Sequence, residues 1–161
     1  MLTTETSTAI SAIEHISNNM SDRPVVYIQR SESFSACHRL HSRHLSNADN
    51  AALYGKCNHP NGHGHNYKVK VTLKGPVDPV TGMVINIVDL KQYIQEAIMS
   101  VLDHKNVDKD VPFFKHQVSS MENITVFIWN SMKAKLGDLL YEIKVHETDH
   151  NVAWYRGEKS N

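Results

Sequence analysis

The sequence has little of what would place it outside a reducing compartment or within a membrane. It contains only two cysteines, Cys37 and Cys57, too few for a disulfide framework. No window approaches the ~20 apolar residues of a membrane helix. Residues 1–23 lack a charged start followed by an apolar run, and their first Arg is Arg23, which argues against a secretory signal or an Arg-rich transit peptide. These absences predict a soluble, cytoplasmic protein.

An excess of charge is also absent, because 17 basic and 17 acidic residues cancel. The composition therefore gives no reason to expect nucleic acid or an anionic membrane surface as a partner, and a small molecule or another protein is favoured. At 161 residues the chain has the size of one domain. We expect a flexible N-terminal tail over residues 1–23 and a single folded domain over residues 24–161.

Histidine, in contrast, is abundant, with 11 residues. Six of them fall close together in the sequence: His38, His41, His44, His59, His63 and His65. Such a concentration is a reason to look for a metal site.

Hydrophobic periodicity predicts strands toward both ends of the domain and two helices between them. Strands are expected at Val25–His38, His63–Leu73, Tyr141–Glu147 and Val152–Tyr155, with a short additional one at Met83–Ile85. Helices are expected from the N-cap Asn86 to Leu102, and from a capping box at Ser119–Glu122 to Gly137. The order ββααββ predicts an α+β domain, a four-stranded antiparallel sheet with two helices on one face. The other face is expected to carry His38, His63, His65 and Glu147, or to be covered by another subunit, so we expect an oligomer.

The stretch GKCNHPNGHGHNYKVKV places two histidines on the apolar face of a strand. His63 and His65 alternate in phase with Tyr67 and Val69, and side chains two apart on a strand lie ~6.5–7 Å from each other. His38 faces inward on the preceding strand, so the three imidazoles fit a zinc site that keeps one coordination position open. The alternative is that one or more of them are ordinary core or surface histidines.

Cys57, six residues before His63, allows several interpretations. As a fourth ligand it would close the metal site and make it structural; otherwise it is a reactive thiolate beside the metal, or an inert buried thiol. Spacing alone does not decide between them. Cys37 falls on the strand face opposite His38 and is expected to pack.

Three further residues carry chemistry that the fold alone does not require. Asp103 and His104 follow a helix end, where an acidic neighbour can orient an imidazole for proton transfer, although a solvated helix end is the alternative. Glu147 is a carboxylate at an inward strand position. It suits either a ligand with paired N–H donors, such as an amino-pyrimidine, or a buried lysine of the same chain.

Taken together, several segments resemble the 6-pyruvoyl tetrahydropterin synthase family, from about residue 25 to residue 158. They are FSACHRL (34–40), GKCNHPNGHGHNYKVKV (55–71), DPVTGMVINIVDLK (78–91), LDHKN (102–106), SSMENI (119–124) and VHETD (145–149). Five residues separate Cys57 from His63, as in the animal-type synthases, whereas the related 6-carboxy-tetrahydropterin synthases usually have three.

The resemblance implies a site and a reaction. His38, His63 and His65 would bind Zn²⁺, one ion per subunit, and Cys57 would be the general base working with Asp103 and His104. Glu147 would anchor the pterin, and Ser120 and Glu122 would contribute to its binding. The enzyme would be a lyase that converts 7,8-dihydroneopterin triphosphate to 6-pyruvoyl-tetrahydropterin, with loss of triphosphate, in tetrahydrobiopterin biosynthesis.

The resemblance also implies an assembly, a homohexamer built as a dimer of trimers, in which strands from three subunits close a barrel (the T-fold). Whether Mg²⁺ accompanies the triphosphate stays open. Two positions depart from the family pattern: Met121 stands where a threonine is common, and His59 where an asparagine is usual. A 6-carboxy-tetrahydropterin synthase-type enzyme and a non-catalytic zinc-stabilised binding module remain as alternatives.

Overall fold

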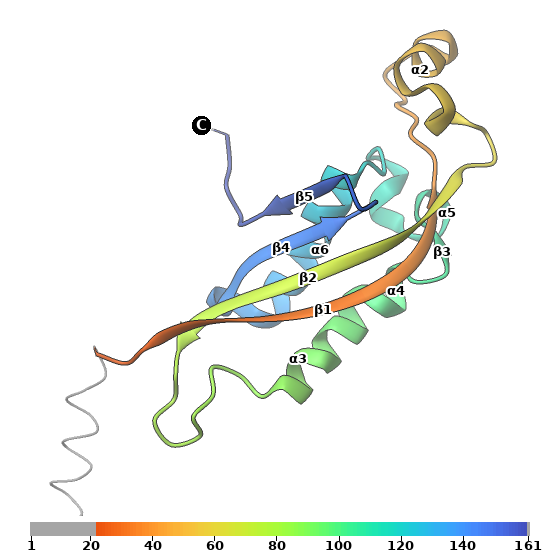
Figure 1. Cartoon of the computed structure of the whole chain (residues 1–161). Coiled ribbons are helices and arrows are strands. Elements are labelled where there is room, and N and C mark those ends of the chain that lie inside the picture. The colour runs from red at the N-terminus through yellow and green to blue at the C-terminus, as the bar shows by residue number, and fades with distance from the viewer. Residues whose placement is uncertain (1–21, 161) are drawn as a thin grey trace, which may run out of the picture.

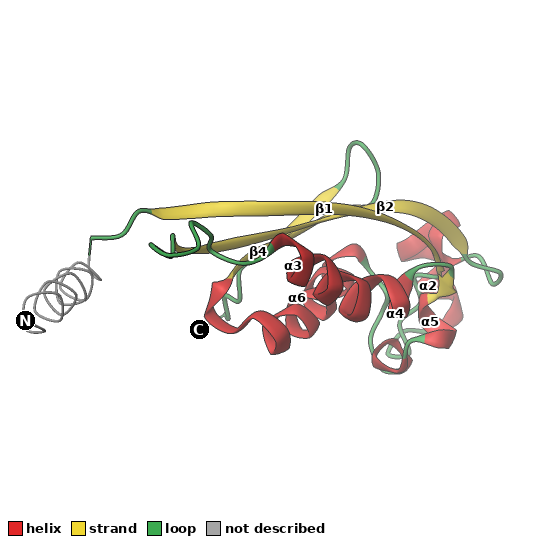
Figure 2. Ribbon diagram, turned by 90° about the horizontal axis from the view of Figure 1, so that it is seen from below, coloured by secondary structure: helices red, strands yellow, loops and turns green. Residues whose placement is uncertain are grey.

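The computed structural model describes residues 22–160 of the chain. The expected tail over residues 1–23 lies almost wholly outside this range. The described residues form two layers, a sheet and a set of helices packed on one of its faces (Figures 1 and 2). An α+β domain is therefore confirmed.

Two long strands form the centre of the sheet. β1 (Val25–His38) and β2 (His63–Pro76) pair antiparallel along all of their 14 residues. Their register places His38 directly opposite His63. Both strands were expected from their alternating patterns, and their pairing brings the predicted metal ligands together.

The sheet has five strands, in the order β3-β1-β2-β4-β5. β4 (Leu140–His146) and β5 (Val152–Tyr155) continue it antiparallel, whereas β3 (Lys105–Asn106) pairs parallel to β1. The expectation of a four-stranded, purely antiparallel sheet was therefore wrong. A strand of two residues is too short to show a period of two, so no sequence pattern predicts β3.

Two helical segments cover one face of this sheet (Figure 2). The first runs through α3 (Ile87–Ile94), a π-helical turn η2 (Gln95–Met99) and α4 (Ser100–Leu102), with Asn86 as its N-cap. The second is α6 (Met121–Leu136), which ends at Gly137 as expected. Its N-cap is Ser120, not Ser119, so the predicted capping box was wrong by one residue. Met83–Ile85, expected as a short strand, lies in a bend.

The core lies between these helices and the inward face of the sheet. Tyr67, Val69, Val71 and Leu73 of β2 are fully buried there, and His63 and His65 continue the same row toward the start of the strand. The histidines thus share the face that the helices cover. The expectation that they lie on the opposite face was wrong, because the row they extend is the row that packs against α3 and α6.

Smaller helices lie at the end of the sheet that carries the histidines. α2 (Asn47–Tyr54) and the 3-10 turn η1 (Gly55–Asn58) connect β1 to β2, and in Figure 1 this connection extends beyond both strands. α5 (Val107–Asp110) and the 3-10 turn η3 (Pro112–Lys115) lead toward α6. A further 3-10 turn, η4 (Gly137–Leu139), connects α6 to β4 at the other end of the sheet. α2 was not expected, because Asn50 is its only buried residue and it has no apolar stripe.

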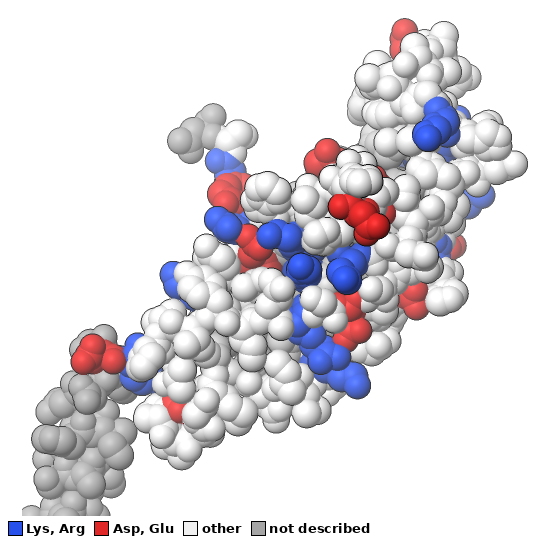
Figure 3. All heavy atoms as spheres, viewed as in Figure 1, with Lys and Arg blue, Asp and Glu red and all other residues white. Residues whose placement is uncertain are grey.

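The helix-free face of the sheet is polar and basic, and Lys and Arg side chains gather over its central strands (Figure 3). A bulge between Thr72 and Leu73 of β2 shifts the register with β4. As a result Tyr141 packs edge-on against Tyr27, with ring centroids 4.8 Å apart, and the expectation that it shares the inward face with Ile143 was wrong. Within residues 22–160, no helix is long and apolar enough to cross a membrane.

Candidate active site and metal centre

Three imidazoles converge where β1 ends and β2 begins. The ring centroids of His38 and His63 are 4.6 Å apart, those of His63 and His65 are 5.0 Å apart, and those of His38 and His65 are 5.3 Å apart. One ring nitrogen of each lies within 4.8 Å of the corresponding nitrogens of the other two. Small side-chain rotations would bring all three to the ~2 Å that a bound zinc ion requires.

His38 is held in one orientation by the backbone of another element. Its ring is 1% exposed, and Nδ1 lies 2.6 Å from the carbonyl oxygen of Ser119, just before α6. Because a carbonyl only accepts, Nδ1 carries the proton and Nε2 keeps its lone pair for a ligand. This is the arrangement found for histidine ligands of metals.

Asp108 fixes the residues on both sides of that contact. One of its carboxylate oxygens accepts the backbone N–H of Arg39, the residue after His38, at 2.6 Å, and the other accepts the hydroxyl of Ser119, also at 2.6 Å. Neither Asp108 nor Ser119 was assigned to the site from the sequence, and Ser119 was expected only as part of a helix cap. The contact from His38 to Ser119 spans 81 residues and uses a backbone atom, so no local pattern signals it.

His63 and His65 are poised in the neutral form that binds metals. Burial lowers the pKa of both rings, and the neighbouring histidines add to the effect for His63. Nδ1 of His63 is buried and has no hydrogen-bond partner among the residues that the structure describes. An unpaired buried nitrogen in a set of three converging imidazoles fits a zinc ion with an open coordination position.

Aromatic rings form the floor beneath the histidines. Tyr67 is fully buried, stacks on Phe34 at 5.0 Å between ring centroids, and packs edge-on against His65 at 5.5 Å. Burial, together with the nearby Glu147, raises the pKa of its hydroxyl. The hydroxyl of Tyr67 therefore stays uncharged, and its ring packs beneath the histidines.

Glu147 faces the same point from the end of β4, as expected for an inward position. Its Oε1 lies 3.7 Å from Nε2 of His38 and 3.9 Å from Nε2 of His65, and its side chain is 17% exposed. Its backbone N–H donates to the carbonyl of Asn151, which closes the turn between β4 and β5. No lysine or arginine pairs with its carboxylate among residues 22–160, so it remains available to a ligand.

Cys57 lines the same cavity, which has a volume of about 640 Å³. It lies in η1, and its carbonyl accepts the backbone N–H of Leu40 at 2.9 Å. Its sulfur is not part of the set of ligand atoms that lie within 4.8 Å of one another. The geometry is that of three nitrogens with a thiol beside them, and it does not favour a closed four-ligand centre.

Gly62 gives this cavity its shape. Its φ is +75°, and a Cβ there would lie 2.9 Å from both the sulfur of Cys37 and the carbonyl oxygen of His38. Only glycine combines that backbone with such a close approach. The turn after Cys57 can therefore pass against the end of β1 and deliver His63 opposite His38.

Asp103 and His104 lie beside β1, in the turn that leads into the edge strand β3. Asp103 accepts the backbone N–H of Ser35 at 2.9 Å, which lowers its pKa, and its other oxygen lies 2.9 Å from Nδ1 of His104. His104 donates its backbone N–H to the carbonyl of Ser35 and has a φ of +58°, unusual for a residue other than glycine. This strained turn holds the imidazole of His104, which is 84% exposed, against the carboxylate of Asp103.

Within one chain these groups do not meet Cys57. His104 lines a cavity with Ser35, Cys37 and Asn66, and Cys57 lines the metal cavity; only His65 lines both. The structure thus places the Asp103–His104 pair apart and brings together five of the predicted site residues: His38, His63, His65, Cys57 and Glu147.

Ser120 and Glu122 lie at the start of α6. The hydroxyl of Ser120 accepts the backbone N–H of Asn123, so it caps the helix. Glu122 is exposed in the first turn and lines none of the cavities described here. Their expected part in pterin binding stays a prediction.

Comparisons with known proteins identify the family of the chain. The family model described as 6-pyruvoyl tetrahydropterin synthase matches residues 27–158. The 6-pyruvoyl tetrahydrobiopterin synthase of Poecilia reticulata is 59% identical over 143 residues, 88% of this chain and 97% of the relative, and that of Homo sapiens is 56% identical over 132 residues, 81% of this chain and 91% of the relative.

A solved structure gives the same result for the fold. The Caenorhabditis elegans 6-pyruvoyl tetrahydropterin synthase superimposes with a TM-score of 0.82 at 44% identity, over 84% of this chain and 98% of that one. Both the match of most of the chain to the family model and the identity of its relatives lead to one conclusion. The chain belongs to the 6-pyruvoyl tetrahydropterin synthase family of enzymes.

Proposed function

We propose that the chain is a zinc-dependent lyase that converts 7,8-dihydroneopterin triphosphate to 6-pyruvoyl-tetrahydropterin and triphosphate, in tetrahydrobiopterin biosynthesis. One observation carries the proposal: three converging imidazole nitrogens share a cavity of about 640 Å³ with a thiol and an inward carboxylate. The names of the similar proteins support it.

His38, His63 and His65 would hold the zinc ion. When bound, Zn²⁺ supplies a Lewis acid that makes the C–H bonds beside the side-chain hydroxyls of the substrate more acidic. The carbonyl of Ser119 directs Nε2 of His38 toward the cavity, and the lowered pKa values of His63 and His65 favour the neutral, binding form. A single ion per chain follows from a single set of this kind within residues 22–160.

Glu147 and Cys57 would act on the substrate itself. The two oxygens of an ionised Glu147 match the paired N–H donors of a pterin ring, which orients the side chain of the substrate toward the histidines. Cys57, on another wall of the cavity, would remove the protons that shift as the hydroxyls become ketones. Because the ring is reduced by the same electrons that leave the side chain, the reaction needs no redox cofactor.

Asp103 and His104 would relay protons from a second subunit. A carboxylate oxygen of Asp103 lies 2.9 Å from Nδ1 of His104, but His104 lines a different cavity from Cys57 in the same chain. An assembly that places the exposed His104 of one subunit beside Cys57 of another would complete the site. A cytoplasmic homohexamer of two trimers, with barrels closed by the strands of three subunits, is the assembly we propose.

Product analysis tests this function. The zinc-loaded protein is incubated with 7,8-dihydroneopterin triphosphate, and the pterin product is identified by mass spectrometry together with released triphosphate. We expect 6-pyruvoyl-tetrahydropterin and one triphosphate for each substrate consumed. Formation of 6-carboxy-tetrahydropterin would show the related carboxy-type activity instead, and absence of turnover would contradict the proposal.

A further inference from the structure

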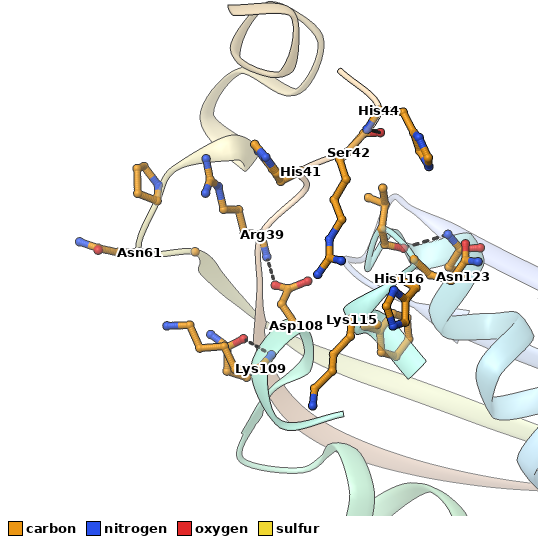
Figure 4. A pocket seen from close by; sticks show the side chains of 17 residues that line it. Arg39, His41, Ser42, His44, Asn61, Asp108, Lys109, Lys115, His116 and Asn123 are labelled. Atoms are coloured by element: carbon orange, nitrogen blue, oxygen red, sulfur yellow. Dashed lines mark hydrogen bonds between the residues drawn. The ribbon is translucent and has the colours of Figure 1, made fainter. Parts of the chain in front are cut away.

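A second cavity lies beside the metal cavity, and none of the residues to which the proposed function assigns a role lines it. Its volume is about 390 Å³, and three regions of the chain line it: the connection from β1 to α2, the turn before β2, and the segment from α5 to the first turn of α6 (Figure 4). Along residues 39–41 the chain alternates between the two cavities. Arg39 and His41 line the second cavity, whereas Leu40 lines the metal cavity.

Positive charge is concentrated in this second cavity. Four of the 17 basic residues of a chain with no net charge line it, namely Arg39, Arg43, Lys109 and Lys115. Asp108 is the single carboxylate in the lining, so four positive charges against one negative charge leave an excess of three. His41, His44 and His116 add further N–H groups.

No carboxylate among residues 22–160 forms an ion pair with these four basic side chains. Asp108 directs one oxygen to the backbone N–H of Arg39 and the other to the hydroxyl of Ser119. Within residues 22–160, no Asp or Glu oxygen lies within 4.0 Å of the side-chain nitrogens of the four basic residues. Uncompensated charges that surround a hollow favour a bound anion.

The basic residues come from separate segments of the chain and line one cavity. Nε and Nη2 of Arg39 donate to the backbone and side-chain oxygens of Asn58 at 2.8 and 3.2 Å, which holds this guanidinium in place. In Figure 4, Arg39 and His41 lie on one side of Asp108, and Lys115 and His116 lie on the other. Arginine and lysine on opposite walls are suited to the oxygens of a phosphorylated ligand.

We propose that this cavity binds a polyphosphate anion. A single phosphate group carries about two negative charges, fewer than the excess of three, whereas a chain of phosphates carries more and also spans separated basic groups. The ligand is either free inorganic triphosphate or the triphosphate of a substrate molecule whose pterin lies elsewhere in the assembly. The chemistry recognised is the same for both sources.

A titration with sodium tripolyphosphate tests the proposal without any need for turnover. Isothermal titration calorimetry on the whole, assembled protein compares the wild type with Arg43→Ala/Lys115→Ala. Both side chains are exposed, and neither donates a hydrogen bond to another residue in the range 22–160, so the variant is expected to fold. The matched control is Lys91→Ala/Lys159→Ala, which removes the same charge from exposed positions outside the cavity.

We expect saturable binding to the wild type, a Kd about tenfold higher in Arg43→Ala/Lys115→Ala, and no change in the control. Absence of saturable binding to the wild type, or equal weakening in the two variants, would overturn the proposal. The source of the anion follows from KM for 7,8-dihydroneopterin triphosphate. A parallel rise in KM assigns the cavity to the substrate triphosphate, and an unchanged KM with weakened tripolyphosphate binding assigns it to a free anion.

Discussion

Nδ1 of His38 lies 2.6 Å from the carbonyl oxygen of Ser119, and Asp108 holds the residues on both sides of this contact. The ligand nitrogen of β1 is thus oriented from the loop that precedes α6. Because the carbonyl itself cannot be mutated, the role of the contact is tested through Asp108.

Asp108→Asn is expected to weaken zinc binding by about tenfold or more. Both carboxylate oxygens of Asp108 accept a hydrogen bond, whereas the amide of asparagine has only one oxygen that can accept. Competition with a chromophoric chelator measures the zinc affinity. Asp89→Asn, at an exposed position in the first turn of α3, is the matched control and should leave that affinity unchanged. If Asp108→Asn and wild type bind zinc with equal affinity, Asp108 does not help to position the metal ligands.

Glu147→Gln is expected to lower kcat/KM for 7,8-dihydroneopterin triphosphate by about 10- to 100-fold, because a hydrogen-bonded charge is lost at an inward position. The loss should fall largely on KM if Glu147 anchors the pterin ring. Steady-state kinetics measure both constants, and Glu96→Gln, on an exposed helix surface, is the control. A full loss of bound zinc in Glu147→Gln would instead assign Glu147 to the metal.

Mixed assemblies test whether the active site is shared between subunits. Cys57→Ala and His104→Ala are each expected to be inactive. Subunits of the two variants that are unfolded together and reassembled should regain activity, because about a quarter of randomly formed sites combine an intact Cys57 with an intact His104. Each variant reassembled alone is the control. If each variant is inactive alone and the mixture recovers no activity, Cys57 and His104 act within one chain.

His146 on the helix-free face predicts a pH dependence of stability. Burial lowers its pKa below the ordinary value of 6.5, and Lys70, Lys144 and Lys68 lower it further, while Asp149 opposes them. The unfolded chain therefore takes up a proton near pH 6.5 that the folded chain takes up only at lower pH. Stability should decrease as the pH falls below 6.5 and should level off below the folded-state pKa.

The measurement is the urea midpoint at about pH 7.5 and about pH 5.5, for wild type and His146→Gln. The wild type is expected to lose more stability between these two values than His146→Gln does. The two proteins should differ little at the higher pH, where both side chains are uncharged. Parallel losses in both would show that other groups cause the acid sensitivity.

Local patterns were sufficient to place the histidine pair in the apolar row of β2, but not to predict that the helices cover that row. The alternation from His63 to Leu73 places both imidazoles on the buried face, and the same alternation places His38 on the inward face of β1. That His38 lies opposite His63 follows from the register of two strands of equal length, which the pattern allows but does not specify.

What the sequence did not reveal depends on contacts between distant residues or on very short elements. The partner of His38 is a backbone oxygen 81 residues away, and β3 pairs only two residues with β1. The cavity lined by Arg39, Arg43 and Lys115 forms from segments that carry no shared motif. Composition concealed it as well, since the charges of the whole chain cancel.

The most direct test of the account compares wild type with Cys57→Ala for bound zinc and for turnover of 7,8-dihydroneopterin triphosphate. We expect Cys57→Ala to keep one zinc ion per chain, because three imidazole nitrogens suffice as ligands, and to lose formation of 6-pyruvoyl-tetrahydropterin. Loss of zinc together with the sulfur would instead make the centre a closed, structural one and contradict an open catalytic site.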